Sequence, residues 1–195
     1  MFGLFNNPEK TALNLYHDAI KPFMDNLLSM WELKTNERQL PASIWESIYL
    51  NSFFWHLCIF NLAFSQNRAV EPNDHLIAKL VLFNHLVPNN LKWLVEKNID
   101  SVNKFRHDPD YNESLSLAWE EGANNGFDMV AFVFGKLEPE TLLNSPHFIE
   151  ANKKARKFIG NQIDESNILA DPTYKDVMFS ELVNILIFES DYFPF

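Results

Sequence analysis

Residues 53–60 read Phe-Phe-Trp-His-Leu-Cys-Ile-Phe and form the middle of the most apolar run of the chain, residues 44–64. At 100° per residue this stretch is apolar nearly all round, as in a helix enclosed by other elements. The polar residues around it share an arc of about 80° and are Ser43, Ser47, Asn51, Asn61 and Ser65. We therefore predict a central helix over residues 41–66 whose ends meet water.

The same run has the length of a membrane span, at 21 residues. Its composition argues against a span, because a bilayer core disfavours polar side chains. The polar residues within it are Glu46, Ser47, Asn51, Ser52, His56 and Asn61. We expect a core helix and no transmembrane segment.

Prolines mark the other helix starts. Proline suits the first helical turn, where the N–H groups have no intrahelical acceptor. Six of the ten prolines stand at or near the start of an apolar run with helical spacing, namely Pro8, Pro41, Pro72, Pro139, Pro146 and Pro172. Three of them follow a residue whose side-chain oxygen can cap a helix: Asn7, Ser145 and Asp171.

The first helix is predicted over residues 8–34, with a kink at Pro22 because the apolar period continues on both sides of it. Its apolar face comprises Leu13, Tyr16, Ile20, Phe23 or Met24, Leu27 and Trp31. Further helices are predicted over residues 73–87, 91–105, 113–134, 146–162 and 172–189, with a turn near Pro139.

The segment 113–134 leaves two alternatives, because Gly122 to Gly126 could be a turn before a strand over residues 127–134. We favour a helix, since the apolar register continues across both glycines. The glycines would then let a neighbouring helix approach closely, and Gly135 would end the helix.

Composition agrees with an all-α fold. The 195 residues include 18 Phe, 5 Tyr and 5 Trp but only 5 Gly, which disfavours a turn-rich β architecture. A chain of this length can bury a core without a metal or a disulfide. We predict one domain over residues 1–195, a bundle of about seven helices around the helix at 41–66.

The net charge and the cysteine content limit which partners and which cellular compartment are expected. The net charge of −10 disfavours binding to nucleic acid. The single cysteine, Cys58, excludes an internal disulfide and suits a reducing compartment. The first residues lack the pattern of an export signal. We therefore expect a cytoplasmic protein.

His56 is one candidate for chemistry, as a metal ligand or as a base. We favour a core histidine held by Ser52, one turn earlier on the same helix face. Another candidate is the face of Glu121, Asn124 or Asn125, and Asp128, which could bind Mg²⁺ but more simply faces solvent.

Two further patterns have structural explanations. His17-Asp18 and His107-Asp108 present the adjacent pair that metal-dependent phosphohydrolases use, although the second pair precedes a proline and suits a turn. The basic cluster of residues 153–157 could bind phosphate or an acidic partner, and otherwise forms a solvated helix face. We assign no catalytic, metal or cofactor residues.

The chain ends in an aromatic tail containing Tyr192, Phe193 and Phe195. These rings should be covered, either by the chain's own core, which we favour, or by a partner or second copy. Phe2, Leu4 and Phe5 pose the same alternative at the other end. We predict that the three tail rings bind protein, and a homodimer is one form this could take.

The leading functional hypothesis is a small acidic protein-interaction module that binds or neutralises a protein partner, with a basic one favoured by charge. Inhibitor, immunity and regulatory proteins are of this kind. The alternative is a metal-dependent helical-bundle enzyme, a hydrolase or oxidoreductase, using His56, His85 or the Glu121–Asp128 face. The absence of a local catalytic motif favours the non-enzymatic role.

Overall fold

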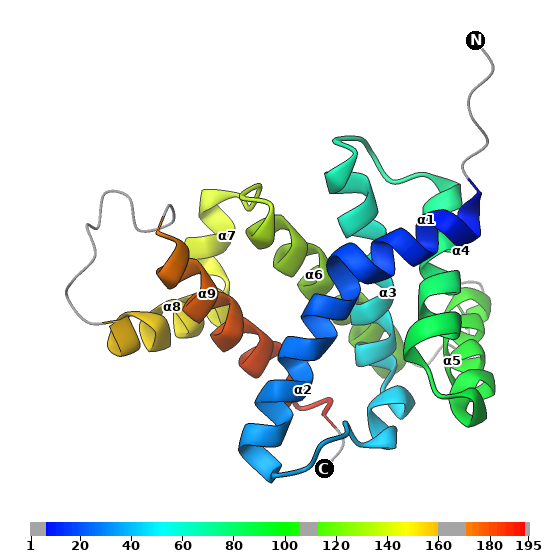
Figure 1. The fold of residues 1–195 in the computed structure, drawn as a ribbon, viewed down its shortest axis with the longest axis horizontal. Coiled ribbons are helices and arrows are strands. Elements are labelled where there is room, and N and C mark those ends of the chain that lie inside the picture. The colour runs from blue at the N-terminus through cyan, green and yellow to red at the C-terminus, as the bar shows by residue number, and fades with distance from the viewer. Residues whose placement is uncertain (1–6, 106–112, 160–170, 194–195) are drawn as a thin grey trace.

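Helices account for all the regular structure in the computed structural model, which describes residues 7–105, 113–159 and 171–193 (Figure 1). The described part of the chain contains no strand, which confirms the all-α fold. Its α-helices are α1 (Pro8–Leu15), α2 (Lys21–Thr35), α3 (Ile48–Ser65), α4 (Pro72–Val81), α5 (Lys92–Phe105), α6 (Glu113–Val133), α7 (Pro139–Asn144), α8 (Pro146–Ile159) and α9 (Pro172–Val183).

Five of the six prolines are the first residues of helices, namely of α1, α4, α7, α8 and α9. At Pro139 this corrects the predicted turn, because the six-residue helix α7 begins there. Two of the predicted caps are present. The side chain of Asn7 accepts a hydrogen bond from the N–H of Glu9, and that of Asp171 accepts one from the N–H of Tyr174. The exception is Pro41, which is extended and precedes a short 3₁₀ turn, Ala42–Glu46.

A π-helical turn, Tyr16–Ile20, joins α1 to α2 immediately before Pro22. The N–H of Lys21 donates to the carbonyl of Tyr16, five residues back. A wider turn relieves the clash between a proline ring and the carbonyl four residues earlier. Figure 1 shows the helix changing direction here, which confirms the predicted kink.

The π-helical turn also corrects the predicted apolar face of the first helix. Ile20, Phe23, Leu27 and Trp31 are buried as expected, but Leu13 is 43% exposed. Because the turn contains one extra residue, the buried positions before it move back by one, to Ala12 and Leu15.

The central helix, α3, begins later than predicted. Ser47 is extended and its side chain accepts a hydrogen bond from the N–H of Leu50, so residues 41–47 are not part of the helix. The N-terminal end of the helix also differs from the prediction that it meets water. Asn51, expected to meet water, is fully buried, and its Nδ2 donates to the carbonyl of Trp45.

Two glycines of α6 bring it against α3, as predicted. A Cβ atom on Gly122 would lie 2.3 Å from the carbonyl oxygen of Tyr49, and one on Gly126 would lie 2.9 Å from that of Phe53. Gly122 thus meets an earlier part of α3 than Gly126 does, so the two helices run in the same direction. In Figure 1 they lie side by side at the centre of the bundle.

The helical alternative for residues 113–134 is confirmed, and so is its end at Gly135. Gly135 has a φ of +64°, which an L-residue adopts only with strain. Its N–H donates to the carbonyl of Phe132, and the N–H of Lys136 donates to that of Ala131. These two bonds are the Schellman arrangement that closes a helix.

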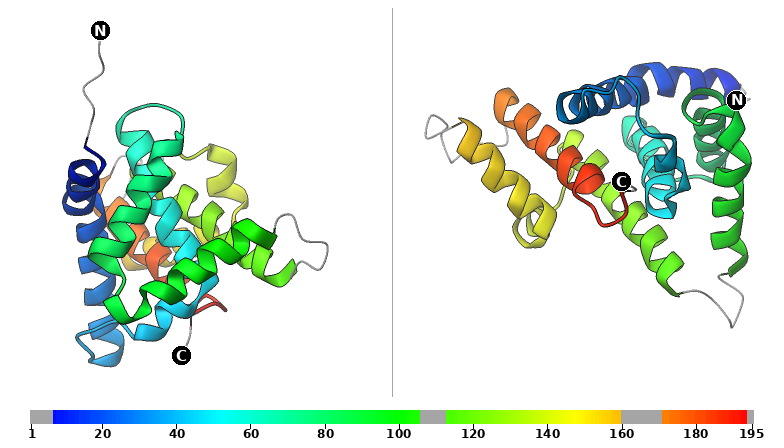
Figure 2. Two further views of the ribbon diagram at one scale, coloured as in Figure 1. Left: turned by 90° about the vertical axis from the view of Figure 1, so that its right-hand side faces the viewer. Right: turned by 90° about the horizontal axis from the view of Figure 1, so that it is seen from below.

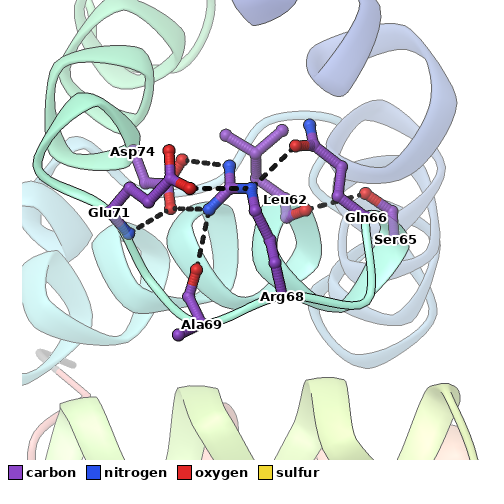
Figure 3. A network of polar contacts seen from close by, with 7 residues as sticks. All are labelled: Leu62, Ser65, Gln66, Arg68, Ala69, Glu71 and Asp74. Atoms are coloured by element: carbon purple, nitrogen blue, oxygen red, sulfur yellow. Dashed lines mark hydrogen bonds and ion pairs between the residues drawn. The ribbon is translucent and has the colours of Figure 1, made fainter.

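An ion pair between the partly exposed Arg68 and the buried Asp74 holds the loop between α3 and α4 (Figure 3). The guanidinium of Arg68 donates to both carboxylate oxygens of Asp74, at 2.7 Å each. The same carboxylate accepts from the N–H of Glu71, which completes a capping box at the start of α4. Burial alone would raise the pKa of Asp74, but these bonds outweigh it and lower that pKa.

The remaining helices flank the central pair. Figure 2 shows α8 and α9 on one side of α3 and α6, and α4 and α5 on the other. The hydroxyl of Tyr174 in α9 donates to Oδ1 of Asn152 in α8, at 2.6 Å. Two more π-helical turns, Leu82–Leu86 and Asn184–Phe188, extend α4 and α9.

By length and composition α3 resembles a membrane span, with a mean hydropathy of 1.2. However, 67% of it is buried inside the bundle. A buried core helix has the same composition, so this helix is weak support for a membrane location.

Candidate functional site

The tail residues Tyr192 and Phe193 pack on the chain's own core. The ring of Phe193 lies 5.7 Å from that of Trp31 and 5.3 Å from that of Phe188, between centroids. Tyr192 stacks on Tyr49. Their role in binding a partner stays a prediction, and Phe195, like Phe2, Leu4 and Phe5, lies outside the described residues.

One hydrogen bond connects this tail to α6, and others connect α3 to α6 and to the turn before the tail. The hydroxyl of Tyr192 donates to Oε2 of Glu121, which raises the pKa of Tyr192. The hydroxyl of Tyr49 donates to the carbonyl of Leu186 and accepts from Nδ2 of Asn125. Burial raises the pKa of Tyr49, so it remains a neutral donor.

The Glu121–Asp128 face is therefore divided among different surroundings. Glu121 accepts a hydrogen bond from the tail residue Tyr192, whereas Asn125 donates to Tyr49 of α3. Asn124 is exposed, and Asp128 is half-buried with a pKa raised by that burial. The described residues contain no group of three or more His, Cys, Asp or Glu side chains placed to hold a metal ion.

His56 is half-buried between α3 and α6. Its Nδ1 lies 3.2 Å from Oγ of Ser52, the partner expected from the sequence, and 2.9 Å from the Ser52 carbonyl oxygen. Oγ of Ser52 donates to the carbonyl of Trp119. This arrangement ties α3 to α6. Cys58 is buried, which raises the pKa of its thiol.

The other histidine candidates lie near the first helix. The half-buried ring of His85 stacks on Tyr16, with centroids 4.4 Å apart. Burial lowers the pKa of His85, and the neighbouring His17 lowers it further. His17 and Asp18 are exposed, whereas His107 and Asp108 lie outside the described residues.

The basic cluster at 153–157 lies on the outer face of α8. Nζ of Lys154 contacts the carboxylate of Glu189 at 2.9 Å, which lowers the pKa of Glu189. Lys153 pairs with Glu150. The opposite side of α8 packs inward through Phe148 and Ala155, so the cluster forms a helix face as favoured.

A cleft of about 570 Å³ lies between α2, α3, α6 and α9. In Figure 1 these helices meet near the centre of the view. The cleft is mostly apolar, and the side chains that line it include Phe23, Leu57, Met129, Phe132, Phe134 and Phe179. A concave apolar site of this volume can take a small molecule or side chains of a partner.

The mouth of the cleft carries exposed apolar residues at the end of α6. Val133 is 54% exposed and Phe134 is 37% exposed, and both line the cleft. Phe127, about two turns earlier, is 38% exposed and contacts Phe60 edge-on, with centroids 4.9 Å apart. Exposed apolar side chains that gather beside a cleft mark an interaction surface.

Polar groups occupy a few positions in the cleft wall. Asp18 and Asp176 are exposed, and Lys175 is half-buried. Asn26 also lines the cleft, and its Oδ1 is buried without accepting a hydrogen bond from any described residue. An unsatisfied buried acceptor costs free energy, so this oxygen lowers the stability of the wall.

A second groove of about 550 Å³ continues from the cleft along α1. The two share Asp18, Ala19, Asn61 and Phe134. The groove is more polar than the cleft, with walls that include Asn7, Lys10, Asn14, Ser65 and Gln66. Together they form one continuous concave surface beside the first helix.

Sequence reasoning did not find this surface, because its walls come from four helices distant in the chain. The one available signal was Asn61, a polar residue next to the apolar run of α3. Comparison with family models, with curated protein sequences and with solved structures finds no match to this chain.

Proposed function

We propose that this chain is a cytoplasmic protein-interaction module that binds a protein partner through the cleft between α2, α3, α6 and α9. The observation that carries the proposal is the exposed pair Val133 and Phe134 beside an apolar concavity. Apolar anchors seated in such pockets supply most of the binding free energy at protein interfaces. The net charge of −10 favours a basic partner, as expected of an inhibitor, immunity or regulatory protein.

The alternative, a metal-dependent enzyme, has no specific observation in its favour. Native mass spectrometry of the protein from its own source cells separates the two, since it reports bound metal, copy number and co-purifying protein together. A complex with a basic protein supports the proposal. Stoichiometric metal, whose removal by a chelator lowers the Tm, counts against it.

Site-specific photo-crosslinking tests the cleft itself. Benzoylphenylalanine at position 133 should yield one crosslinked partner in the source cells, whereas the same group at Leu33, which is 87% exposed on α2 and outside the cleft wall, should not.

A cleft-filling variant gives the matched control. Ala19→Phe places a ring where the cleft and the groove meet and should abolish the crosslink at position 133. Ala123→Phe enlarges a half-buried alanine of α6 outside the cleft wall and should leave it intact. Circular dichroism and Tm confirm that both variants fold. Equal crosslinking from positions 33 and 133, or a crosslink that persists in Ala19→Phe, contradicts the proposal.

A further inference from the structure

The chemistry of the cleft wall indicates what kind of group it binds. Four phenylalanine rings line it, namely those of Phe23, Phe132, Phe134 and Phe179. Phe23 and Phe179, from α2 and α9, meet edge-on with centroids 5.9 Å apart. The faces of aromatic rings carry partial negative charge and attract cations. This wall therefore suits an apolar group that also carries positive charge.

The polar groups of the same wall point to the same ligand. Asp18 lies in the π-helical turn before α2, and Asp176 lies in α9. Neither carboxylate forms an ion pair with a described residue. Lys175 is the cation among the described lining residues, so the wall carries a net charge of −1.

We propose that the cleft binds an apolar cation, supplied in the partner by a lysine or arginine side chain flanked by apolar residues. This inference rests on the proposed function and adds the chemistry of the group that the cleft recognises. The ring faces and the apolar floor contact the hydrocarbon stem, and the carboxylates of Asp18 and Asp176 attract the charge at the mouth.

Three probes that share one chain length test the charge preference: octylammonium, octan-1-ol and octanoate. Each is titrated into the full chain labelled with ¹³C at the methionine methyl groups. Met129 lines the cleft and is fully buried, so its methyl signal reports occupancy, and Met129→Leu assigns that signal. Octylammonium should bind about fivefold more tightly than octanol, because it adds ring and carboxylate attraction. Octanoate should bind most weakly.

The carboxylates are tested by substitution. The double variant Asp18→Asn and Asp176→Asn should weaken octylammonium binding and leave octanol binding unchanged, so the difference between the two probes should shrink to the part that the rings supply. Asp100→Asn, at an exposed aspartate of α5 outside the cleft wall, should leave it unchanged. Equal affinity for octylammonium and octanol overturns the charge preference while the crosslinking test of the cleft still stands. A Met129 signal that responds to none of the probes overturns the inference as well.

Discussion

The ring of Tyr192 stacks on the ring of Tyr49, with centroids 4.7 Å apart and an angle of 14° between their planes. Tyr49 lies in the first turn of α3, and Tyr192 lies in the tail after α9, so this contact closes the chain onto its central helix. The tail therefore contributes to the fold as well as being a predicted binding element.

The tail contacts should contribute measurably to the free energy of unfolding. Phe193→Ala removes a buried ring from between Trp31 and Phe188 and should lower the free energy of unfolding by about 3 kcal/mol. Tyr192→Phe keeps the stack, loses the hydrogen bond to Glu121, and should cost about 1 kcal/mol. Urea titration followed by tryptophan fluorescence measures both. Leu33→Ala, at an exposed position, is the control and should be neutral. Wild-type stability of Phe193→Ala would show that the ring is not docked in solution.

Because α6 lies so close to α3, we expect Gly→Ala substitutions in α6 to destabilise the protein rather than stabilise it. Gly→Ala normally stabilises a helix interior by about 1 kcal/mol. Gly122→Ala should instead destabilise the protein by about 3 kcal/mol, because its Cβ would overlap the backbone of Tyr49. Gly126→Ala should also destabilise the protein, but by less than Gly122→Ala. Thermal unfolding ranks the stabilities of the two variants.

Gly135→Ala is the matched control for these two substitutions. Nothing lies within 4 Å of a Cβ at this position, so its cost is only the positive φ, about 1 kcal/mol. If Gly122→Ala were as stable as wild type, the two helices would be farther apart than the structure shows.

The Arg68–Asp74 pair should stabilise the fold in a way that is lost in acid. Because the pKa of Asp74 is lowered in the folded state, its contribution is complete above the ordinary carboxyl pKa of about 4. It is lost as the pH falls through the lowered value. Asp74→Asn should cost about 3 kcal/mol at pH 7, since it leaves Arg68 without its buried partner.

Urea titrations of wild type and Asp74→Asn between pH 7 and pH 2 would test this. The difference in stability should shrink as the solution becomes acidic. Glu96→Gln, which breaks the exposed pair with Lys79, should cost less than about 1 kcal/mol. A difference that does not change with pH would argue against a lowered pKa for Asp74.

His85 predicts a second pH effect, nearer neutrality. Its pKa is lowered by burial and by His17, so folding favours the neutral ring. Its contribution to stability is complete above the ordinary histidine pKa of about 6.5 and declines as the pH falls from there to the lowered value. Titration of the His85 ring protons by NMR measures this pKa. His17→Gln should raise it towards the ordinary value, and an unchanged pKa would leave burial as its sole cause.

Much of the fold could be predicted from local sequence. The five correctly placed prolines and the caps Asn7 and Asp171 act within one helical turn, so the residues themselves indicate where helices begin. Gly122 and Gly126 also indicated a close helix partner, because a missing side chain matters only where another backbone approaches. The central position of residues 53–60 followed from an apolar surface that no single neighbour could cover.

What only the tertiary structure decided depends on residues far apart in the chain. The start of α3 at Ile48, the burial of Asn51 and the one-residue shift at the π-helical turn depend on packing against neighbouring elements. The cleft was beyond sequence reasoning, because Asp18 and Asp176 are brought to one wall only when α2 and α9 pack together. Helix propensity and capping are local properties, whereas a concave surface exists only after distant helices have met.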